Sequence, residues 1–258
     1  MKIGIVGASG FLGSYLAPFL RDKGHEVFAF DRAHLENIPC DAVVNLAGEP
    51  IAEGRWTAKK KERILASRTE TTKKIVSTLQ PKCLISASGI GYYGHRPEAI
   101  VDESSPKGEG FLSDVCEAWE KEALQAPGRV VCLRFGVILS NRGGAYDKLK
   151  QPFRFGAGAH YISWIHLHDA ARAILWALTH EELKGAVNVC TPHPLTQKQF
   201  VETINGRSFP LPIALIRCIF GEKADGLLLQ DTHAHPSRLI RSGFTFIYPS
   251  LRDALIEL

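Results

Sequence analysis

The stretch "GIVGASGFLG", residues 4–13, places Gly7, Gly10 and Gly13 three residues apart at the end of a short apolar run. Apolar residues then recur at helical spacing from Leu12 to Leu20, so the stretch predicts a strand, a glycine turn and a helix. Gly7 can take the tight turn, Gly10 lets the backbone approach a phosphate, and Gly13 lets helix and strand pack closely. The N–H groups that begin the helix then favour an anion.

The two residues after the second apolar run indicate how the adenosine part of a dinucleotide would be bound. "HEVFAF" at 25–30 is followed by Asp31 and Arg32. An acid at this distance from the glycines accepts hydrogen bonds from the adenosine ribose of NAD, whereas an arginine pairs with the 2′-phosphate of NADP. The glycines and this strand end together predict a nicotinamide dinucleotide site. The sequence does not decide between NAD and NADP, although Arg32 slightly favours NADP.

Strands and helices alternate along the chain. Beyond the first two strands, further strands are expected at 41–47, 82–88, 129–139 and 185–191, and helices at 57–79, 111–125 and 168–180. This alternation predicts an α/β fold with a Rossmann-type, doubly wound parallel sheet. We expect residues 1–190 to form that domain and residues 191–258 to form a small, mostly helical region that covers the substrate. Pro18 predicts a kink in the first helix.

Composition narrows the class of protein. The chain has 258 residues, 45% of them hydrophobic, and a formal net charge of +4, which is too small to indicate nucleic acid. The basic run at 59–63 fits a solvated helix face. No apolar run approaches the roughly 20 residues that cross a bilayer, and the cysteine spacing suggests neither zinc nor disulfides. We expect a cytoplasmic protein that binds a small molecule, without nucleic-acid or membrane partners; its oligomeric state stays open.

Several motifs resemble the extended short-chain dehydrogenase/reductase superfamily. They are the glycine triplet, "NLAG" at 45–48, "SASGIGYYG" at 86–94 and "SWIHLHDAARA" at 163–173. The segments at 48–72, 143–158 and 235–255 look like its atypical branch, the epimerase family proteins related to nucleoside-diphosphate-sugar epimerases, which end in a small C-terminal domain of unknown function. The resemblance covers nearly the whole chain, but the stretch 201–216 is shorter than the family norm.

The resemblance adds to the preference for NADP and assigns cofactor-binding positions. With the glycine motif, these are Gly7, Ser9, Gly10, Phe11, Leu12, Gly13, Asp31, Arg32, Leu46, Ala47, Gly48 and Ser86.

The resemblance also implies an acid that this chain lacks. Active superfamily members have a proton-transferring tyrosine, and a lysine four residues later, on the helix after the "SAS" strand. Phe111 and Val115 stand there, and neither can exchange a proton or supply charge. "YDKLK" at 146–150 has the tyrosine–lysine spacing, but it lies one strand too late and fits a chance match on a solvated turn.

Three other polar residues are the catalytic candidates. Ser88 would orient a substrate oxygen, Tyr93 would border the nicotinamide and act as the acid, and His166 would hydrogen-bond the substrate or relay a proton. His166 and His168 permit a metal pair, but no third ligand is evident and no metal is predicted.

Two functions follow from these patterns. The first is an NAD(P)-binding epimerase or reductase that acts on a small carbonyl or sugar-type substrate. The second is a non-catalytic dinucleotide sensor or scaffold, which the missing tyrosine–lysine pair favours.

Overall fold

A six-stranded parallel sheet forms the centre of the molecule. The computed structural model describes residues 1–31, 35 and 38–258. The strand order is β11-β6-β4-β3-β1-β2, and every neighbouring pair is parallel. The strands are β1 (Lys2–Val6), β2 (Glu26–Phe30), β3 (Ala42–Asn45), β4 (Cys83–Gly89), β6 (Arg129–Phe135) and β11 (Gly185–Val189). The chain steps from β1 to β2 on one side and returns to β3 on the other, so the strand order reverses at β1 and β3, the position where open α/β sheets bind ligands. The expected Rossmann-type fold is confirmed.

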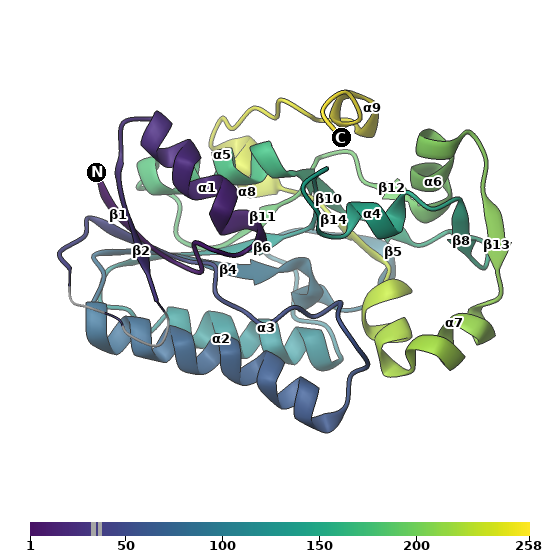
Figure 1. Cartoon of the computed structure of the whole chain (residues 1–258), viewed down its shortest axis with the longest axis horizontal. Coiled ribbons are helices and arrows are strands. Elements are labelled where there is room, and N and C mark those ends of the chain that lie inside the picture. Colours follow the sequence, from purple (N-terminus) through teal and green to yellow (C-terminus); the bar gives the residue numbers. More distant parts are fainter. Residues whose placement is uncertain (32–34, 36–37) are drawn as a thin grey trace.

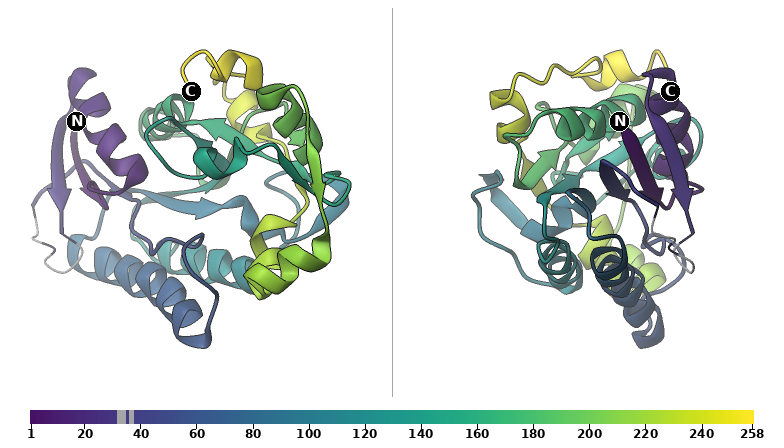
Figure 2. Two further views of the ribbon diagram at one scale, coloured as in Figure 1. Left: turned by 45° about the vertical axis from the view of Figure 1, so that its right-hand side comes forward. Right: turned by 90° about the vertical axis from the view of Figure 1, so that its left-hand side faces the viewer.

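Helices cover both faces of this sheet. They are α1 (Phe11–Asp22) and α5 (Leu167–Thr179) on one face, and α2 (Ala58–Leu79) and α3 (Phe111–Ala123) on the other (Figures 1 and 2). Leu16 and Ile174 belong to the core under the first pair, and Ile75 and Ala123 to the core under the second. α1 runs through Pro18 as one helix, and the expected kink stays a prediction.

The apolar run at 129–139 is not one strand, contrary to the sequence prediction. It divides at Gly136 into β6 and β7 (Val137–Leu139), and β7 leaves the main sheet to pair with β10 (Trp164–His166). A Cβ atom on Gly136 would lie 2.6 Å from the carbonyl oxygen of Ser163. The close crossing of two backbones therefore requires glycine at the point where the strand divides.

Short elements make up the rest of the chain. Three pairs of short strands are β5 (Arg96–Val101) with β14 (Thr232–Ala234), β8 (Phe153–Phe155) with β13 (Phe209–Leu211), and β9 (Tyr161–Ile162) with β12 (Leu195–Thr196). The short helices are η1 (Ile90–Tyr93), α4 (Tyr146–Leu149), α6 (Gln197–Asn205), α7 (Ile213–Phe220), the π-helix η2 (Ala224–Leu228), α8 (Ser237–Arg241) and α9 (Leu251–Ala254).

The carboxyl-terminal region returns to the main sheet. Leu239 and Phe244 belong to the same core cluster as Leu16, so side chains from both sides of residue 190 share one core. The division of the chain at residue 190 stays a prediction. Among the described residues, no helix combines the length and the apolar character needed to cross a membrane.

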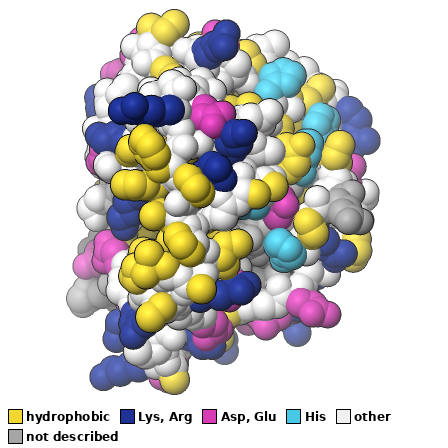
Figure 3. Space-filling model, turned by 90° about the vertical axis from the view of Figure 1, so that its right-hand side faces the viewer, with side chains coloured by type: hydrophobic (Ala, Val, Ile, Leu, Met, Phe, Trp, Pro, Cys, Tyr) yellow, Lys and Arg dark blue, Asp and Glu magenta, His cyan; other side chains and the backbone are white. Residues whose placement is uncertain are grey.

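One face of the molecule exposes apolar side chains. Figure 3 shows them gathered, with Lys and Arg among them, on the side that carries α7 and the β8–β13 pair. Phe209, Ile213, Leu215 and Ile219 are 45%, 38%, 47% and 51% exposed, respectively. This apolar surface reaches a cavity next to α7, because Ile213 also lines that cavity.

Candidate cofactor and substrate site

The glycine loop is a tight turn between β1 and α1. Gly7 has a φ of +88°, which favours glycine, and a Cβ atom there would meet the backbone of Leu46 and Ala47 at 3.0 Å. A Cβ atom on Gly13 would lie 2.1 Å from the Gly7 carbonyl oxygen. The loop can therefore pass between β3 and α1 only because both positions lack a side chain.

The start of α1 is suited to an anion. Gly10 precedes the helix and donates a hydrogen bond to the Gly7 carbonyl oxygen at 3.1 Å, which closes the turn. Within the described chain, no side chain caps this helix start, and its first turn holds no acidic residue. The first N–H groups of a helix seek an acceptor and carry partial positive charge. These residues therefore fit the pyrophosphate of a dinucleotide.

The residues after β3 form a second wall beside the loop. The side-chain oxygen of Asn45 accepts a hydrogen bond from the Ala47 N–H at 3.1 Å, and its amide nitrogen donates to Thr72 of α2 at 2.8 Å. Arg68 packs behind the same wall, since a Cβ atom on Gly48 would lie 3.0 Å from its Cζ. α2 thus holds residues 46–48 in place before a ligand arrives.

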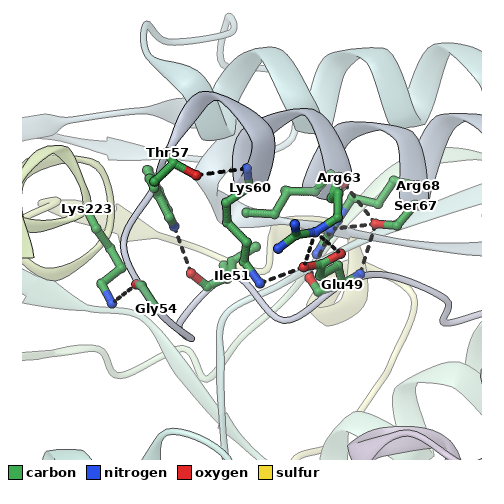
Figure 4. A network of polar contacts seen from close by, with 11 residues as sticks. Glu49, Ile51, Gly54, Thr57, Lys60, Arg63, Ser67, Arg68 and Lys223 are labelled. Atoms are coloured by element: carbon green, nitrogen blue, oxygen red, sulfur yellow. Dashed lines mark hydrogen bonds and ion pairs between the residues drawn. The ribbon is translucent and has the colours of Figure 1, made fainter.

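A charged network fixes the segment that follows, residues 49–57 (Figure 4). Glu49 accepts hydrogen bonds from Lys60 at 2.7 Å and from Arg63 at 3.1 Å, and the bond from Lys60 holds the pKa of its carboxyl below the usual value. From the other side, Lys223 donates to the Gly54 carbonyl oxygen at 2.6 Å. Sequence reasoning missed this network, because the basic run at 59–63 looks like an ordinary solvated helix face.

Ser88 and Tyr93 are joined by a buried chain of hydrogen bonds. The Ser88 hydroxyl donates to Glu120 at 2.7 Å, and Arg134 donates to both oxygens of Glu120 at 2.8 Å. Arg134 also donates to the Tyr93 hydroxyl at 3.0 Å, and Tyr93 donates to Asn188 at 2.7 Å. All five residues are at most 8% exposed. The sequence placed Arg134 and Asn188 near strand ends, but it gave no sign that Glu120 joins them.

This network constrains what both hydroxyls can do. Burial raises the pKa of Tyr93 to about 12, although the neighbouring Arg134 acts in the opposite direction. The partner of Ser88, Glu120, lies about 13 Å along α3 from Phe111, the position where the superfamily has its tyrosine. The catalytic roles of Ser88 and Tyr93 stay predictions, and each requires the network to open.

Apolar side chains fill the place of the missing tyrosine and lysine. The Phe111 ring lies 5.2 Å from the ring of Trp56, Val115 is 3% exposed, and Leu227 of η2 packs against this cluster. A Cβ atom on Gly226 would meet Trp56 at 2.7 Å. The segment 49–57 and η2 thus close over the start of α3.

His166 lies at the start of α5. Its Nδ1 accepts a hydrogen bond from the His168 N–H at 3.3 Å, and its ring lies 4.1 Å from the ring of Tyr248. Burial lowers the pKa of His166, which favours the neutral imidazole. No hydrogen bond between described residues links His166 to Ser88 or Tyr93. In the part of the chain that the structure describes, no group of three or more His, Cys, Asp or Glu side chains could hold a metal.

The "YDKLK" segment is not on a solvated turn. Tyr146 is 7% exposed and packs in a core cluster with Trp164, while Lys150 pairs with Asp147 at 2.6 Å. The preceding Gly144 lies against the start of α1, because a Cβ atom there would be 2.9 Å from the Phe11 ring. The turn just before this segment therefore packs against the first residue of α1.

Asp31 follows the end of β2, and Ser86 lies within β4 beside the last residue of β3. Asp31 follows Phe30, which pairs with Val6 of β1, so Asp31 lies beside the glycine loop. Ser86 is in register with Asn45, and its hydroxyl donates to the Ala87 carbonyl oxygen at 3.3 Å. Arg32 lies outside the described residues.

The parallel sheet, the glycine loop and the open helix start define an α/β protein with the NAD(P)-binding type of Rossmann fold. Residues 3–111 match the NAD dependent epimerase/dehydratase family, and residues 211–258 match a Domain of unknown function (DUF1731). An epimerase family protein of Mycobacterium bovis is 37% identical over 98% of this chain and 96% of its own length. The chain belongs to the epimerase family, as its sequence motifs indicated.

Solved structures agree with this assignment. The crystal structure of the human epimerase family protein SDR39U1 with NADPH has a TM-score of 0.91 at 31% identity, and the match covers 99% of this chain and 98% of that one. A nucleoside-diphosphate sugar epimerase from Corynebacterium glutamicum has a TM-score of 0.80 at 28% identity, and the match covers 57% of that longer chain.

Proposed function

We propose that this protein binds NADPH, or less favourably NADH, and catalyses reduction of a small carbonyl compound or the reverse oxidation. The observation that carries the proposal is the cradle formed by Gly7, Gly13 and the uncapped start of α1. When bound, the cofactor supplies or accepts a hydride at its nicotinamide ring. The human relative's structure with NADPH supports the preference for NADPH.

Three groups of residues in this chain would bind the dinucleotide. The N–H groups that begin α1 would hold the pyrophosphate, residues 46–48 would form the opposite wall, and Asp31 and Arg32 would meet the adenosine ribose. The free thiols of all six cysteines are consistent with our proposal that the protein acts in the reducing cytoplasm.

Ser88, Tyr93 and His166 remain the proposed catalytic groups. Tyr93 would give its own hydroxyl proton to the substrate oxygen after releasing Asn188, Arg134 would stabilise the phenolate that forms, and solvent would return the proton. Ser88 would reach substrate only after leaving Glu120. The apolar cluster around Phe111 and the closed state of this network favour a second candidate, a dinucleotide-binding protein without turnover.

One experiment separates the two functions. NADPH and NADH are titrated against the full chain by calorimetry, and oxidation of bound NADPH is then followed with a panel of ketones and aldehydes. We expect NADPH to bind more tightly than NADH, and Tyr93→Phe to slow oxidation at least about tenfold with an unchanged NADPH Kd. Ser14→Ala, on the exposed side of α1, is the matched control.

The outcomes are distinct. If NADPH binds but no carbonyl compound oxidises it, the protein is a dinucleotide-binding protein without turnover. If Ser88→Ala and Tyr93→Phe leave turnover unchanged, the catalytic assignment is wrong. If neither cofactor binds, the glycine loop is only architectural and both functions are rejected.

A further inference from the structure

A cavity of about 520 Å³ lies next to α7, away from the glycine loop. One wall is the segment from Phe155 to His160, and the other consists of Ile213 and Arg217 of α7 with Asp225 of η2. Its volume is in the range of pockets that hold small organic molecules.

The segment "GAGA" at 156–159 is the reason that the cavity is hollow. Gly156 has a φ of +56°, and a Cβ atom there would lie 2.9 Å from the Ile213 side chain. Gly158 has a φ of +66°, and a Cβ atom there would lie 3.0 Å from the backbone nitrogen of Lys198. The backbone therefore turns sharply against its neighbours, while Ala157 and Ala159 add only methyl groups to the wall.

Flat and apolar side chains form most of the remaining wall of the cavity. The rings of Phe155 and His160 are nearly parallel, with centroids 6.3 Å apart and an interplanar angle of 12°. Burial lowers the pKa of His160, so its imidazole is neutral at pH 7. His95 accepts a hydrogen bond from the Asp231 N–H on Nδ1 at 3.1 Å, which leaves its Nε2 to donate to a ligand oxygen.

The charged side chains that line the cavity, Arg217 and Asp225, are 60% and 56% exposed at its mouth and pair with each other. Arg217 is the only Lys or Arg among the described lining residues, and it holds Asp225 through three hydrogen bonds of 2.9 to 3.2 Å. Arg154 and Lys198 lie close to Gly158 but do not line the cavity. A diphosphate is bound through charge-assisted hydrogen bonds from cations that lack another partner. The cavity offers no such cation among its described residues.

The cavity lies near the proposed reaction site. His95 comes two residues after Tyr93, beyond the carboxyl end of β4, where ligands of doubly wound sheets bind. η2 borders both places, because Asp225 lines the cavity while Leu227 packs against the cluster at the start of α3. η2 therefore connects the wall of the cavity to that cluster.

We infer that this cavity binds an uncharged, mainly apolar carbonyl compound and does not accept the diphosphate of a nucleotide sugar. Its identification as the substrate pocket rests on the proposed function, but binding itself does not.

The first test measures binding to the full chain, without and with saturating NADPH, by calorimetry. The uncharged probes are 2-acetylnaphthalene, acetophenone and 2-decanone, and the charged probe is UDP-glucose. We expect at least one ketone to bind more tightly than UDP-glucose, whose Kd should be weaker than about 1 mM. Ala157→Trp should fill the cavity and weaken that ketone at least about tenfold, while Ala214→Trp, on the exposed side of α7, should not.

The second test removes the carboxylate that pairs with Arg217. Asp225→Asn leaves Arg217 without its carboxylate partner, so UDP-glucose affinity should rise at least about tenfold. The double variant Asp225→Asn/Arg217→Gln should lose that gain. No change in UDP-glucose affinity in Asp225→Asn would show that the Arg217–Asp225 pair does not exclude the diphosphate.

Failure of this inference and failure of the proposed function give different results. If a ketone binds and Ala157→Trp abolishes binding, but NADPH is never oxidised, the reductase proposal fails and the cavity assignment stands. If no ketone binds, if Ala157→Trp has no effect on ketone affinity, or if UDP-glucose binds more tightly than every ketone, the cavity assignment is overturned.

Discussion

Gly13 determines how closely α1 can approach β1. A methyl group at this position would lie 2.1 Å from the Gly7 carbonyl oxygen and 2.8 Å from Ala8 Cα, and both are backbone atoms with little freedom to move. The sequence predicted this role from spacing alone, because a strand–turn–helix unit with glycines at these positions has few backbone solutions.

We therefore expect Gly13→Ala to weaken NADPH binding at least about tenfold and to lower the Tm by several degrees. Ser14→Ala, at the next and exposed position, should leave both unchanged. Calorimetry gives the Kd and thermal unfolding gives the Tm. An unaltered NADPH Kd in a folded Gly13→Ala protein would mean that the loop does not contact the cofactor.

The position of Ser88 was predictable from the sequence, but its hydrogen-bond partner was not. Its position at the end of an apolar run correctly placed it near a strand end, but its partner Glu120 is 32 residues away along the chain. Arg134 and Glu120 form an ion pair with side chains 5% and 10% exposed. Removing one member of such a buried pair typically costs about 3–5 kcal/mol, so this network serves stability whether or not it serves catalysis.

At the scale of elements, apolar patterning predicted the main sheet and its helices. β3, β4, β11, α2, α3 and α5 begin and end within two residues of the expected ranges, because continuous apolar runs report burial on both faces of a parallel sheet. The short pairs β8–β13 and β9–β12 were not predicted. Their pairing joins segments more than 30 residues apart, and that information is not local.

The first turn of α5 contacts the carboxyl-terminal segment, and the sequence did not predict this contact. Asp169, in the first turn, is fully buried and accepts hydrogen bonds from the N–H groups of Ile247 and Tyr248. His166 and His168 lie beside Tyr248, and burial lowers the pKa of both imidazoles. α5 thus fixes the carboxyl-terminal segment through Asp169 and through Arg172, which donates a hydrogen bond to the Thr245 carbonyl oxygen at 2.7 Å.

Stability should therefore depend on the pH below about 6.5. The pKa of each histidine is lower in the folded than in the unfolded state, so the unfolded chain takes up protons first as the pH falls. We expect the Tm to be highest above pH 6.5 and to decrease as the pH drops through the lowered folded pKa. His166→Asn, which keeps a capping side chain but does not titrate, should flatten this dependence.

His193→Asn is the control for that measurement, because His193 is exposed. Thermal unfolding between pH 5 and pH 8 gives the slopes. Equal slopes in the original protein and in His166→Asn would show that His166 does not carry the pH dependence.

At the scale of the whole molecule, the carboxyl-terminal region holds the segment that follows the cofactor wall. Lys223 is 6% exposed and donates to the carbonyl oxygens of Ala52 and Gly54. Arg55 reaches back to the Cys218 carbonyl oxygen at 2.8 Å, and Lys61 pairs with Glu222 at 2.9 Å. The two regions therefore meet through several polar contacts directly beside the cluster that covers the start of α3.

Lys223→Met tests whether these contacts preorganise the cofactor wall. The side chain keeps its length, but the carbonyl oxygens of Ala52 and Gly54 lose a charged donor, which costs about 1–3 kcal/mol. We expect faster amide hydrogen exchange across residues 50–57 and an NADPH Kd raised by less than about tenfold, because the glycine loop itself is intact. Lys198→Met, at an exposed position, should change neither quantity. If exchange across 50–57 stays slow in Lys223→Met, the packing of Leu227 against the Trp56 cluster is sufficient to hold the segment, and the carboxyl-terminal region does not act on the cofactor through Lys223.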